Sequence, residues 1–129
     1  MHTHTYPNGD TYEGLFINNK KTSHGIYTYA ESESKYSGFY ENDLKNGYGT
    51  FLIKEGELYL GSFKSDLKDG KGIYISKTHL IFGEFLEDQL SGLGLKIHLT
   101  DDKKMEFGNF DKGKLIESKE RTEKSIYNF

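Results

Sequence analysis

The sequence predicts an all-β protein: a single elongated, twisted antiparallel meander of stacked β-hairpins that ends in a short C-terminal helix. Ala30 is the only alanine and valine is absent, whereas 10 Tyr and 9 Phe favour a pleated, half-buried surface. Glycine occurs 15 times in 129 residues, and Pro7 is the only proline. Neither a collagen helix nor a proline-rich linker has this composition. The high glycine content therefore suggests that glycine recurs at regular intervals along the chain.

The glycines recur in one register with aromatic residues, and this repeat is the third observation that predicts the fold. Each unit has a large apolar residue, a glycine and a second aromatic at alternate positions, then two glycine positions seven and nine residues later. The four units are Tyr12, Gly14, Phe16, Ser23 and Gly25; Tyr36, Gly38, Tyr40, Gly47 and Gly49; Tyr59, Gly61, Phe63, Gly70 and Gly72; and Ile81, Gly83, Phe85, Gly92 and Gly94. Their starts at 12, 36, 59 and 81 are 24, 23 and 22 residues apart.

Partial units extend the array at both ends, which gives a predicted repeat domain over residues 1–113. The stretch "THTYPNGDTYEG" is the second half of a unit that leads into Tyr12. A fifth start survives in Gly108 and Phe110, but Glu106 occupies its aromatic position and Glu117 a glycine position. Such decay is expected in a terminal repeat.

Each unit is predicted to form a β-hairpin, and the hairpins pair edge to edge into an open sheet of about ten strands. In a strand, Tyr36, Gly38 and Tyr40 share one face, so a ring from one strand can lie over a glycine of its neighbour. This arrangement bends the sheet into a trough with the rings on its concave side. The predicted structural glycines are Gly14, Gly25, Gly38, Gly47, Gly49, Gly61, Gly70, Gly72, Gly83, Gly92, Gly94 and Gly108.

Residues 114–129 depart from the repeat. Leu115, Ile116, Lys119, Ile126 and Tyr127 fit a short amphipathic helix better than strict alternation. We interpret this helix as a cap on the open edge of the last hairpin. The alternative is a partner-binding or partly disordered tail.

Charge and composition exclude several classes of function. The net charge is -3 and Arg121 is the only arginine, so binding to nucleic acid is not expected. Cysteine is absent, which is compatible with a reducing compartment, and no apolar run resembles a signal peptide or a membrane span. The chain is therefore expected to be soluble and intracellular.

Catalytic and metal-binding patterns are not found in the sequence. His2 and His4 have no cysteine or suitably spaced carboxylate to complete a metal site, and "GKG" at residues 70–72 lacks the spacing of a phosphate loop. Carboxylates such as Glu84 fall where the repeat places solvated residues. The protein is expected to be no enzyme and to need neither a metal nor a cofactor.

The repeat resembles the MORN repeat family, whose unit runs approximately Tyr-Glu-Gly-x-Trp/Phe, a polar turn, Gly-x-Gly and an apolar strand. "YPNGDTYEGLF" matches this pattern closely, and the resemblance covers about residues 4 to 112. The four units, the half unit and the charged tail "KGKLIESKERTEKSIYNF" resemble the small retinophilin-like members. The departures are the missing tryptophan, Ser23 in place of glycine, and "YAESESKY", which lacks a glycine turn.

A trough of rings is a good receptor for an extended or helical peptide, because aromatic side chains give large contact area at low entropy cost. The resemblance implies the same function: an adaptor that grips a segment of a cytoskeletal, motor or axonemal protein, such as a class III myosin tail. We expect the central rings to contribute most to binding. The predicted contact residues are Tyr12, Phe16, Tyr27, Tyr36, Tyr40, Phe51, Tyr59, Phe63, Tyr74, Phe85, Glu13 and Glu41.

Two other functions stay open at this point. The first is binding to a phospholipid or membrane surface, as the name of the family implies, although the basic pairs Lys20–Lys21 and Lys103–Lys104 are smaller than the clusters that hold anionic lipid. The second is an accessory or targeting subunit of an enzyme complex. The resemblance also implies a cytoplasmic protein that associates with the cytoskeleton or a cilium. The oligomeric state is left open.

Overall fold

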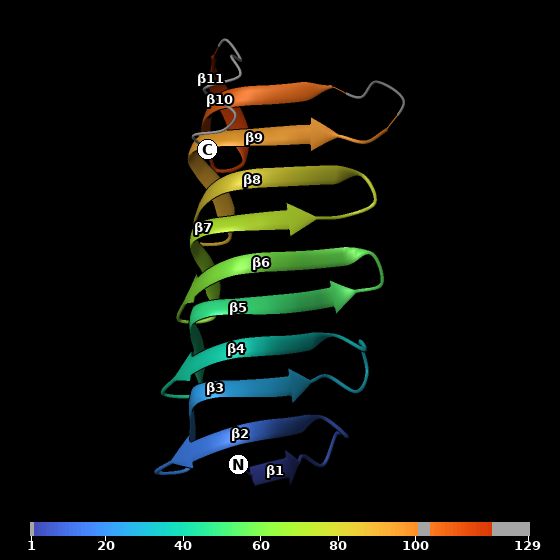
Figure 1. Ribbon diagram of the computed structural model, residues 1–129, viewed down its shortest axis with the longest axis vertical. Coiled ribbons are helices and arrows are strands. Elements are labelled where there is room, and N and C mark those ends of the chain that lie inside the picture. Colours follow the sequence, from blue (N-terminus) through green and yellow to red (C-terminus); the bar gives the residue numbers. More distant parts are fainter. Residues whose placement is uncertain (1, 101–103, 120–129) are drawn as a thin grey trace.

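The protein is a single sheet of 11 antiparallel strands that follow one another in sequence order. The computed structural model describes residues 2–100 and 104–119. Figure 1 shows the strands stacked along one long axis, with β1 and β10 near opposite ends. The strands are β1 (His2–Thr5), β2 (Thr11–Ile17), β3 (Lys20–Thr28), β4 (Lys35–Glu41), β5 (Leu44–Lys54), β6 (Glu57–Lys64), β7 (Leu67–Ile75), β8 (His79–Leu86), β9 (Gln89–His98), β10 (Met105–Asp111) and β11 (Lys114–Ser118). The predicted all-β meander is confirmed.

Two-residue turns close the hairpins within each unit. Both residues of each turn have positive φ, which is the conformation whose twist matches that of the flanking strands. The turns are Asn18–Asn19, Asn42–Asp43, Ser65–Asp66, Glu87–Asp88 and Lys112–Gly113. The connections at the opposite ends of the strands vary in length, from residues 55–56 between β5 and β6 to residues 29–34 between β3 and β4.

A continuous row of glycines crosses the sheet from β2 to β10. Each glycine is the register partner of the next, so that the row runs Gly14, Gly25, Gly38, Gly49, Gly61, Gly72, Gly83, Gly94 and Gly108. Their backbones approach closely: a Cβ added to Gly38 would lie 2.5 Å from the Cα of Gly49. Side chains cannot be accommodated along this line. Glycines let a sheet curve, and the strands of this sheet are strongly bent (Figure 1).

The bend places Tyr12, Tyr36 and Tyr59 on the concave side, which we call the ring face. The ring centroids of Tyr36 and Tyr40 are 5.2 Å apart, although four residues of a straight strand would span about 13 Å. Tyr59 and Phe63 show the same contact at 5.1 Å. We call the opposite side of the sheet the outer face.

The C-terminal part differs from its prediction. Residues 114–118 form strand β11, which pairs with β10, instead of beginning a helix. Leu115 continues the register of the array as the partner of Phe110, so pairing with the open edge outweighs the weak helical pattern. The rest of the predicted helix, residues 120–129, lies outside the described residues. Within the described part of the chain no helix is long and apolar enough to cross a membrane.

Candidate functional site

The ring face is built from tyrosines that lie flat on the glycine row. A Cβ added to Gly49 would lie 2.5 Å from Cε1 of Tyr36, and one added to Gly72 would lie 2.4 Å from the hydroxyl of Tyr59. Each ring therefore occupies the space of two missing side chains, one on its own strand and one on the next. The hydroxyl groups donate to carbonyl oxygens three residues on: Tyr36 to Phe39 at 2.9 Å, and Tyr59 to Ser62 at 3.0 Å.

The fourth unit fills the same space differently. Ile81 stands where the earlier units have tyrosine, and Leu90 covers the glycines instead. A Cβ on Gly83 would lie 2.8 Å from Leu90 Cδ1, and one on Gly94 would lie 3.0 Å from Leu90 Cδ2. Leu90 is 3% exposed, so the packing is preserved although the aromatic residue is lost.

The buried rings form a continuous ladder along the ring face. Neighbouring centroids are 5.1 to 5.5 Å apart, and the ring planes cross at 73° to 90°. Edge-to-face pairs of this kind contribute about 0.5 to 1.5 kcal/mol each beyond the area they bury. The ladder runs Tyr12, Tyr40, Tyr36, Phe63, Tyr59 and Phe85, and the half-buried ring of Phe16 packs against its Tyr12 end.

Three lysines, Lys21, Lys45 and Lys68, cover the ladder, and the sequence analysis missed them. Their ammonium groups lie 5.0 to 5.9 Å from the centroids of two or three rings each, within reach of cation–π attraction. The side chains are only 11% to 22% exposed. A lysine nine residues after the first aromatic of each of the first three units is the signal that could have revealed them.

An aspartate from the next hairpin holds each of these lysines. Asp43 accepts a hydrogen bond from the backbone N–H of Lys21 at 2.8 Å and pairs with its ammonium group at 3.3 Å. Asp66 repeats both contacts with Lys45, at 2.8 and 3.8 Å. Asp88 repeats them with Lys68, at 2.8 and 3.9 Å. We call this recurring contact the aspartate clasp.

The electrostatic environment keeps the tyrosines of the ring face neutral. Burial raises the pKa of Tyr36 and Tyr59 well above the ordinary value. Burial, followed by a hydrogen bond to Glu57, raises the pKa of Tyr74 to about 12. Burial also lowers the pKa of Lys45, while Asp66 opposes that shift. At neutral pH the phenols are therefore hydrogen-bond donors.

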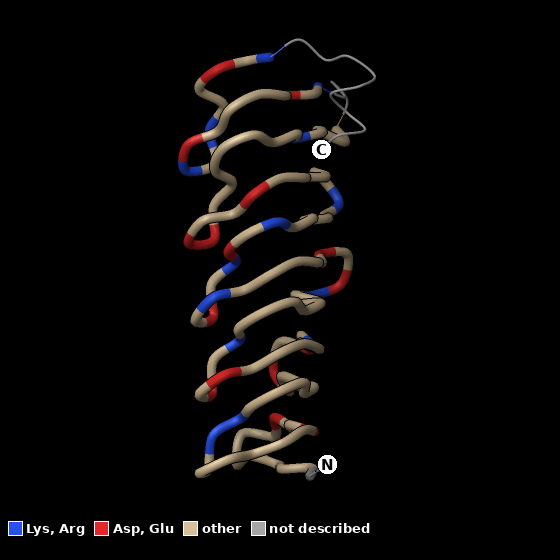
Figure 2. Tube along the Cα trace, turned by 60° about the vertical axis from the view of Figure 1, so that its left-hand side comes forward, with Lys and Arg blue, Asp and Glu red and all other residues tan. Residues whose placement is uncertain are grey.

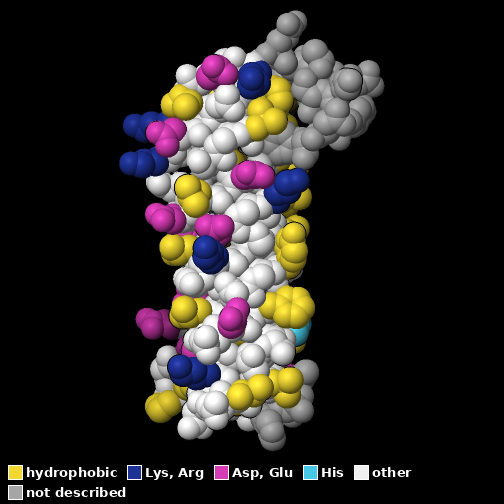
Figure 3. All heavy atoms as spheres, turned by 90° about the vertical axis from the view of Figure 1, so that its left-hand side faces the viewer, with side chains coloured by type: hydrophobic (Ala, Val, Ile, Leu, Met, Phe, Trp, Pro, Cys, Tyr) yellow, Lys and Arg dark blue, Asp and Glu magenta, His cyan; other side chains and the backbone are white. Residues whose placement is uncertain are grey.

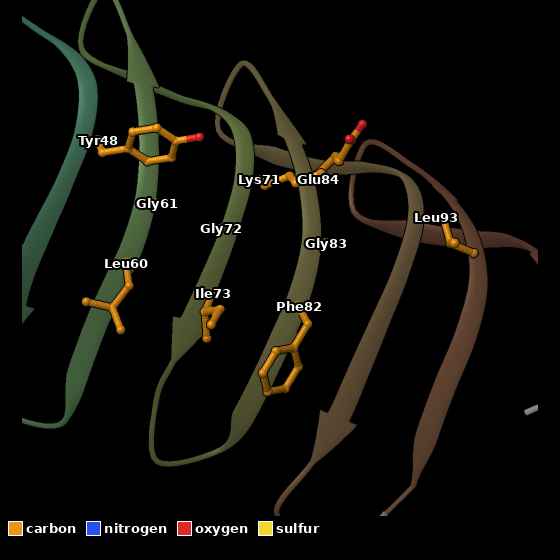
Figure 4. A pocket seen from close by; sticks show the side chains of 10 residues that line it. All are labelled: Tyr48, Leu60, Gly61, Lys71, Gly72, Ile73, Phe82, Gly83, Glu84 and Leu93. Carbon is orange, nitrogen blue, oxygen red and sulfur yellow. The ribbon is translucent and has the colours of Figure 1, made fainter. Parts of the chain in front are cut away.

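Two hollows lie on opposite faces of the sheet. The one on the ring face has a volume of about 440 Å³ and is lined by Tyr74, Ile81 and Leu90, with Lys68 and Lys96 among its charged residues. The one on the outer face has a volume of about 710 Å³. Figure 4 shows Leu60, Ile73 and Phe82 on one side of this outer hollow and Lys71 and Glu84 on the other, with glycines between them.

The predicted contact residues fall into three groups. Six rings are at most 6% exposed and belong to the packed core: Tyr12, Tyr36, Tyr40, Tyr59, Phe63 and Phe85. Four rings are half-buried and form a second layer that solvent reaches: Phe16, Tyr27, Phe51 and Tyr74. Glu13 and Glu41 are exposed and alternate with the rings along their strands, so they belong to the outer face. Direct contact between a partner and the six core rings stays a prediction.

The predicted structural glycines serve two different purposes. Nine of them form the glycine row. Gly47, Gly70 and Gly92 lie outside it and have φ of 103°, 98° and 81°, beside the shifts in strand register. These three glycines are needed for backbone conformation and not to make room for a ring.

Comparison with known proteins finds one family. The MORN repeat model matches residues 12–32, 36–57 and 59–80, which together make up half of the chain. These segments are the first three full units, and the unit that begins at residue 81 has the same strands and glycine pairs. No curated protein matches the chain. Among the described residues, no three His, Cys, Asp or Glu side chains are placed to hold a metal ion.

Proposed function

Because the chain belongs to the MORN repeat family, whose repeats are commonly protein- or membrane-binding modules and generally not catalytic, we propose that it is a non-enzymatic adaptor that holds a segment of another protein along its ring face. The observation that carries this proposal is the second layer of half-buried rings. Phe16, Tyr27, Phe51 and Tyr74 rest on a rigid core and keep part of their apolar surface accessible. Rigid aromatic side chains of this kind are typical of binding surfaces.

The spacing of the rings specifies the partner segment. Successive units lie two strands apart, which is about 9.6 Å along the array. An extended peptide advances this distance in about three residues, and an α-helix in about six or seven. The partner is therefore a segment with apolar side chains at every third position if it is extended, or once in two turns if it is helical.

The charges on the ring face add a preference to this pattern. Lys21, Lys45 and Lys68 retain 11% to 22% of their side-chain exposure, and their aspartates lie toward the hairpin turns. Acidic side chains between the apolar positions of the partner would meet these ammonium groups. The resemblance to retinophilin-like proteins supports a cytoskeletal or ciliary partner, a myosin tail among them, and a cytoplasmic location.

Membrane binding receives less support from the same surface. Lys21 lies over the rings of the ladder and is paired with Asp43, so Lys20 and Lys21 do not act as a pair of free cations. Figures 2 and 3 show acidic and basic residues interspersed along the array, without a large area of one sign. Anionic lipid is usually held by clusters of about 4 to 8 cations.

An affinity capture experiment with matched variants tests the proposal. The intact chain is expected to retain a protein at moderate salt, and a Phe16→Ala/Phe51→Ala variant is expected to lose it. Phe39→Ala on the outer face, where Phe39 is 47% exposed, is the control and is expected to retain the protein. Retention by the ring-face variant, or salt-sensitive flotation with anionic liposomes in place of protein capture, would overturn the proposal.

A further inference from the structure

The fourth unit differs from the first three at three positions of the ring face. Ile81 stands where they have tyrosine, Leu90 where they have the clasped lysine, and Lys96 where they have a half-buried ring. The earlier residues are Tyr12, Tyr36 and Tyr59; Lys21, Lys45 and Lys68; and Tyr27, Phe51 and Tyr74. The cation of this unit has therefore moved to another position, and its first ring is missing.

The missing ring interrupts the ladder. In the earlier units the first tyrosine contacts the second aromatic residue of its own unit and that of the next, as Tyr59 contacts Phe63 at 5.1 Å and Phe85 at 5.3 Å. Within the described part of the chain, Phe85 has no such ring on its other side, and the next ring of the core cluster is Phe110. A ring is thus missing beside Ile81, between Phe85 and Phe110.

The hollow on the ring face lies at this interruption. Its volume is about 440 Å³, and its apolar lining includes Tyr74, Ile81, Phe85 and Leu90. Phe85 and Leu90 are 6% and 3% exposed, so they form the floor, while Tyr74 and Ile81 are half-buried. Ligand pockets in proteins measure about 300 to 1,000 Å³. The hollow therefore has room for one ring and part of the chain that carries it.

Both carboxylates that line the hollow have partners within the chain. Glu57 accepts a hydrogen bond from the hydroxyl of Tyr74 and pairs with Lys54 at 3.9 Å. Asp88 belongs to the aspartate clasp of Lys68. The negative charges at the hollow are therefore already balanced by lysines.

Lys96 is a cation of the hollow that no described carboxylate pairs with. Its ammonium group donates to the carbonyl of Gly113 at 3.1 Å and lies 5.9 Å from the ring centroid of Phe110. Glu106 is its register partner, but this carboxylate contacts Nε2 of His98 at 2.6 Å instead. An ammonium group has three hydrogens to donate, so Lys96 can also bind an acidic group at the hollow.

We propose that the hollow on the ring face is the anchor site for the partner: it takes an aromatic side chain, and Lys96 binds an Asp or Glu next to that side chain. This inference rests on the proposed function, because it places one residue of the partner segment on the ring face. The partner's ring lies beside Phe85, where the ladder lacks one. Edge-to-face contacts and the ammonium groups of Lys68 and Lys96 favour an aromatic side chain there. The site also fixes which part of the partner lies over the fourth unit.

Methyl NMR with small probes tests the site on the full chain without a partner. The probe 3-phenylpropionate has a ring and a carboxylate, and 3-phenylpropylamine has the same ring on a cation. We expect the acid to shift the methyl signals of Ile81 and Leu90, to leave Ile26 on the outer face unchanged, and to bind about threefold tighter than the amine or better. Lys96→Gln keeps a donor for Gly113 and should remove this difference. No shift at Ile81 and Leu90, or equal binding of the two probes, would overturn the proposal.

A variant that restores the repeat tests the site with the captured partner. Ile81→Tyr places a ring in the hollow, because Leu90 already covers the glycines, and is expected to weaken partner binding about tenfold or more. Ile26→Tyr on the outer face is the matched control and should bind normally. Circular dichroism checks that both variants fold.

The outcomes separate this proposal from the proposed function. Undiminished affinity in a folded Ile81→Tyr variant, together with loss of binding in Phe16→Ala/Phe51→Ala, would overturn the anchor site and uphold the adaptor. Undiminished affinity in both variants would overturn both. Loss of binding in both, with normal binding by Ile26→Tyr, is the result that we expect.

Discussion

At the scale of single residues, the glycines divide into those that lie beneath rings and those that need a left-handed backbone. Gly49 belongs to the first kind, because an added Cβ would lie 2.5 Å from the ring of Tyr36. Gly92 belongs to the second: its φ is 81°, and an added Cβ would have no atom within 4 Å. Asparagine distinguishes the two, because it tolerates the left-handed conformation but needs space for its side chain.

We predict that Gly49→Asn lowers the free energy of unfolding by about 1 to 3 kcal/mol, because the tyrosine ring must move. Gly92→Asn is the control and is expected to cost less than about 1 kcal/mol. Urea denaturation monitored by circular dichroism measures both. Equal losses of unfolding free energy in the two variants would mean that the packing of the rings is not the reason for glycine at the positions of the row.

Ser23 is a strained exception in the first unit. It occupies the position of Gly47, Gly70 and Gly92 and has φ of 57° without being glycine. We predict that Ser23→Gly raises the free energy of unfolding by about 0.5 to 1 kcal/mol. Glycine relieves the left-handed strain, and this gain is larger than the cost of the extra entropy that glycine gives the unfolded chain. Ser37→Gly, in the extended strand β4, should instead lower it. A lower stability of Ser23→Gly would show that the serine is not strained.

The sequence was most informative about the glycines and least informative about burial. The spacing alone brought Tyr36, Gly38 and Gly49 into one unit. It did not distinguish the fully buried Tyr36 from the half-buried Phe51, because that difference depends on how far the sheet bends. A lysine beside a polar turn is usually solvated. The position of the Lys45 side chain, whose ammonium group lies over three rings, was therefore also not predicted.

At the scale of the hairpin, the aspartate clasp explains why three turns have aspartate at a left-handed position that favours glycine. Asp43, Asp66 and Asp88 have φ of 72°, 73° and 74°. Each gains a hydrogen bond to the preceding hairpin, which offsets the strain. The last turn has Gly113 at this position, and the preceding hairpin has Leu90 where the earlier hairpins have the clasped lysine.

The clasp has a pH dependence that can be measured at Asp43. The backbone N–H of Lys21, followed by its ammonium group, lowers the pKa of Asp43. A lowered carboxyl pKa stabilises the fold above the pKa of the unfolded chain, and this contribution is lost as pH falls through the folded-state pKa. Asp43→Asn keeps the oxygen acceptor and the left-handed backbone but removes the charge.

We predict that Asp43→Asn costs less than about 1 kcal/mol at neutral pH, since Asp43 is 44% exposed. The difference from the unmodified chain should shrink as pH falls below the ordinary aspartate pKa and through the lowered folded-state pKa of Asp43. Denaturant unfolding at a series of pH values measures it. A difference that stays constant with pH would assign the effect to geometry instead of charge.

The C-terminal strand shows where element prediction fails. Leu115 and Ile116 are compatible with either periodicity over so short a segment, and the open edge of β10 decides in favour of a strand. By contrast, the hairpins from β2 to β9 were predicted correctly, because the repeated spacing of glycine and aromatic residues fixes both arms of each one.

At the scale of the whole molecule, the array has two faces of different composition. The ring face has a packed ladder beneath a second layer of accessible rings, and the outer face has a row of apolar side chains in its C-terminal half: Leu60, Ile73, Phe82, Leu95 and Phe107. The repeat predicted the first face, because each of the first three units contributes the same rings. It could not predict the apolar row, because Leu60, Phe82 and Phe107 replace polar residues of the earlier units and so follow no repeat.

We propose that the accessible rings of the ring face bind the partner. Calorimetry with the captured partner segment tests it most directly, on variants whose folding is checked by circular dichroism. Phe16→Ala and Phe51→Ala should each weaken binding by about 1 to 3 kcal/mol, because they remove contact area that a partner can reach. Phe39→Ala on the outer face should leave the affinity unchanged. Full affinity in a folded Phe16→Ala/Phe51→Ala variant, or loss of affinity in Phe39→Ala, would contradict the claim.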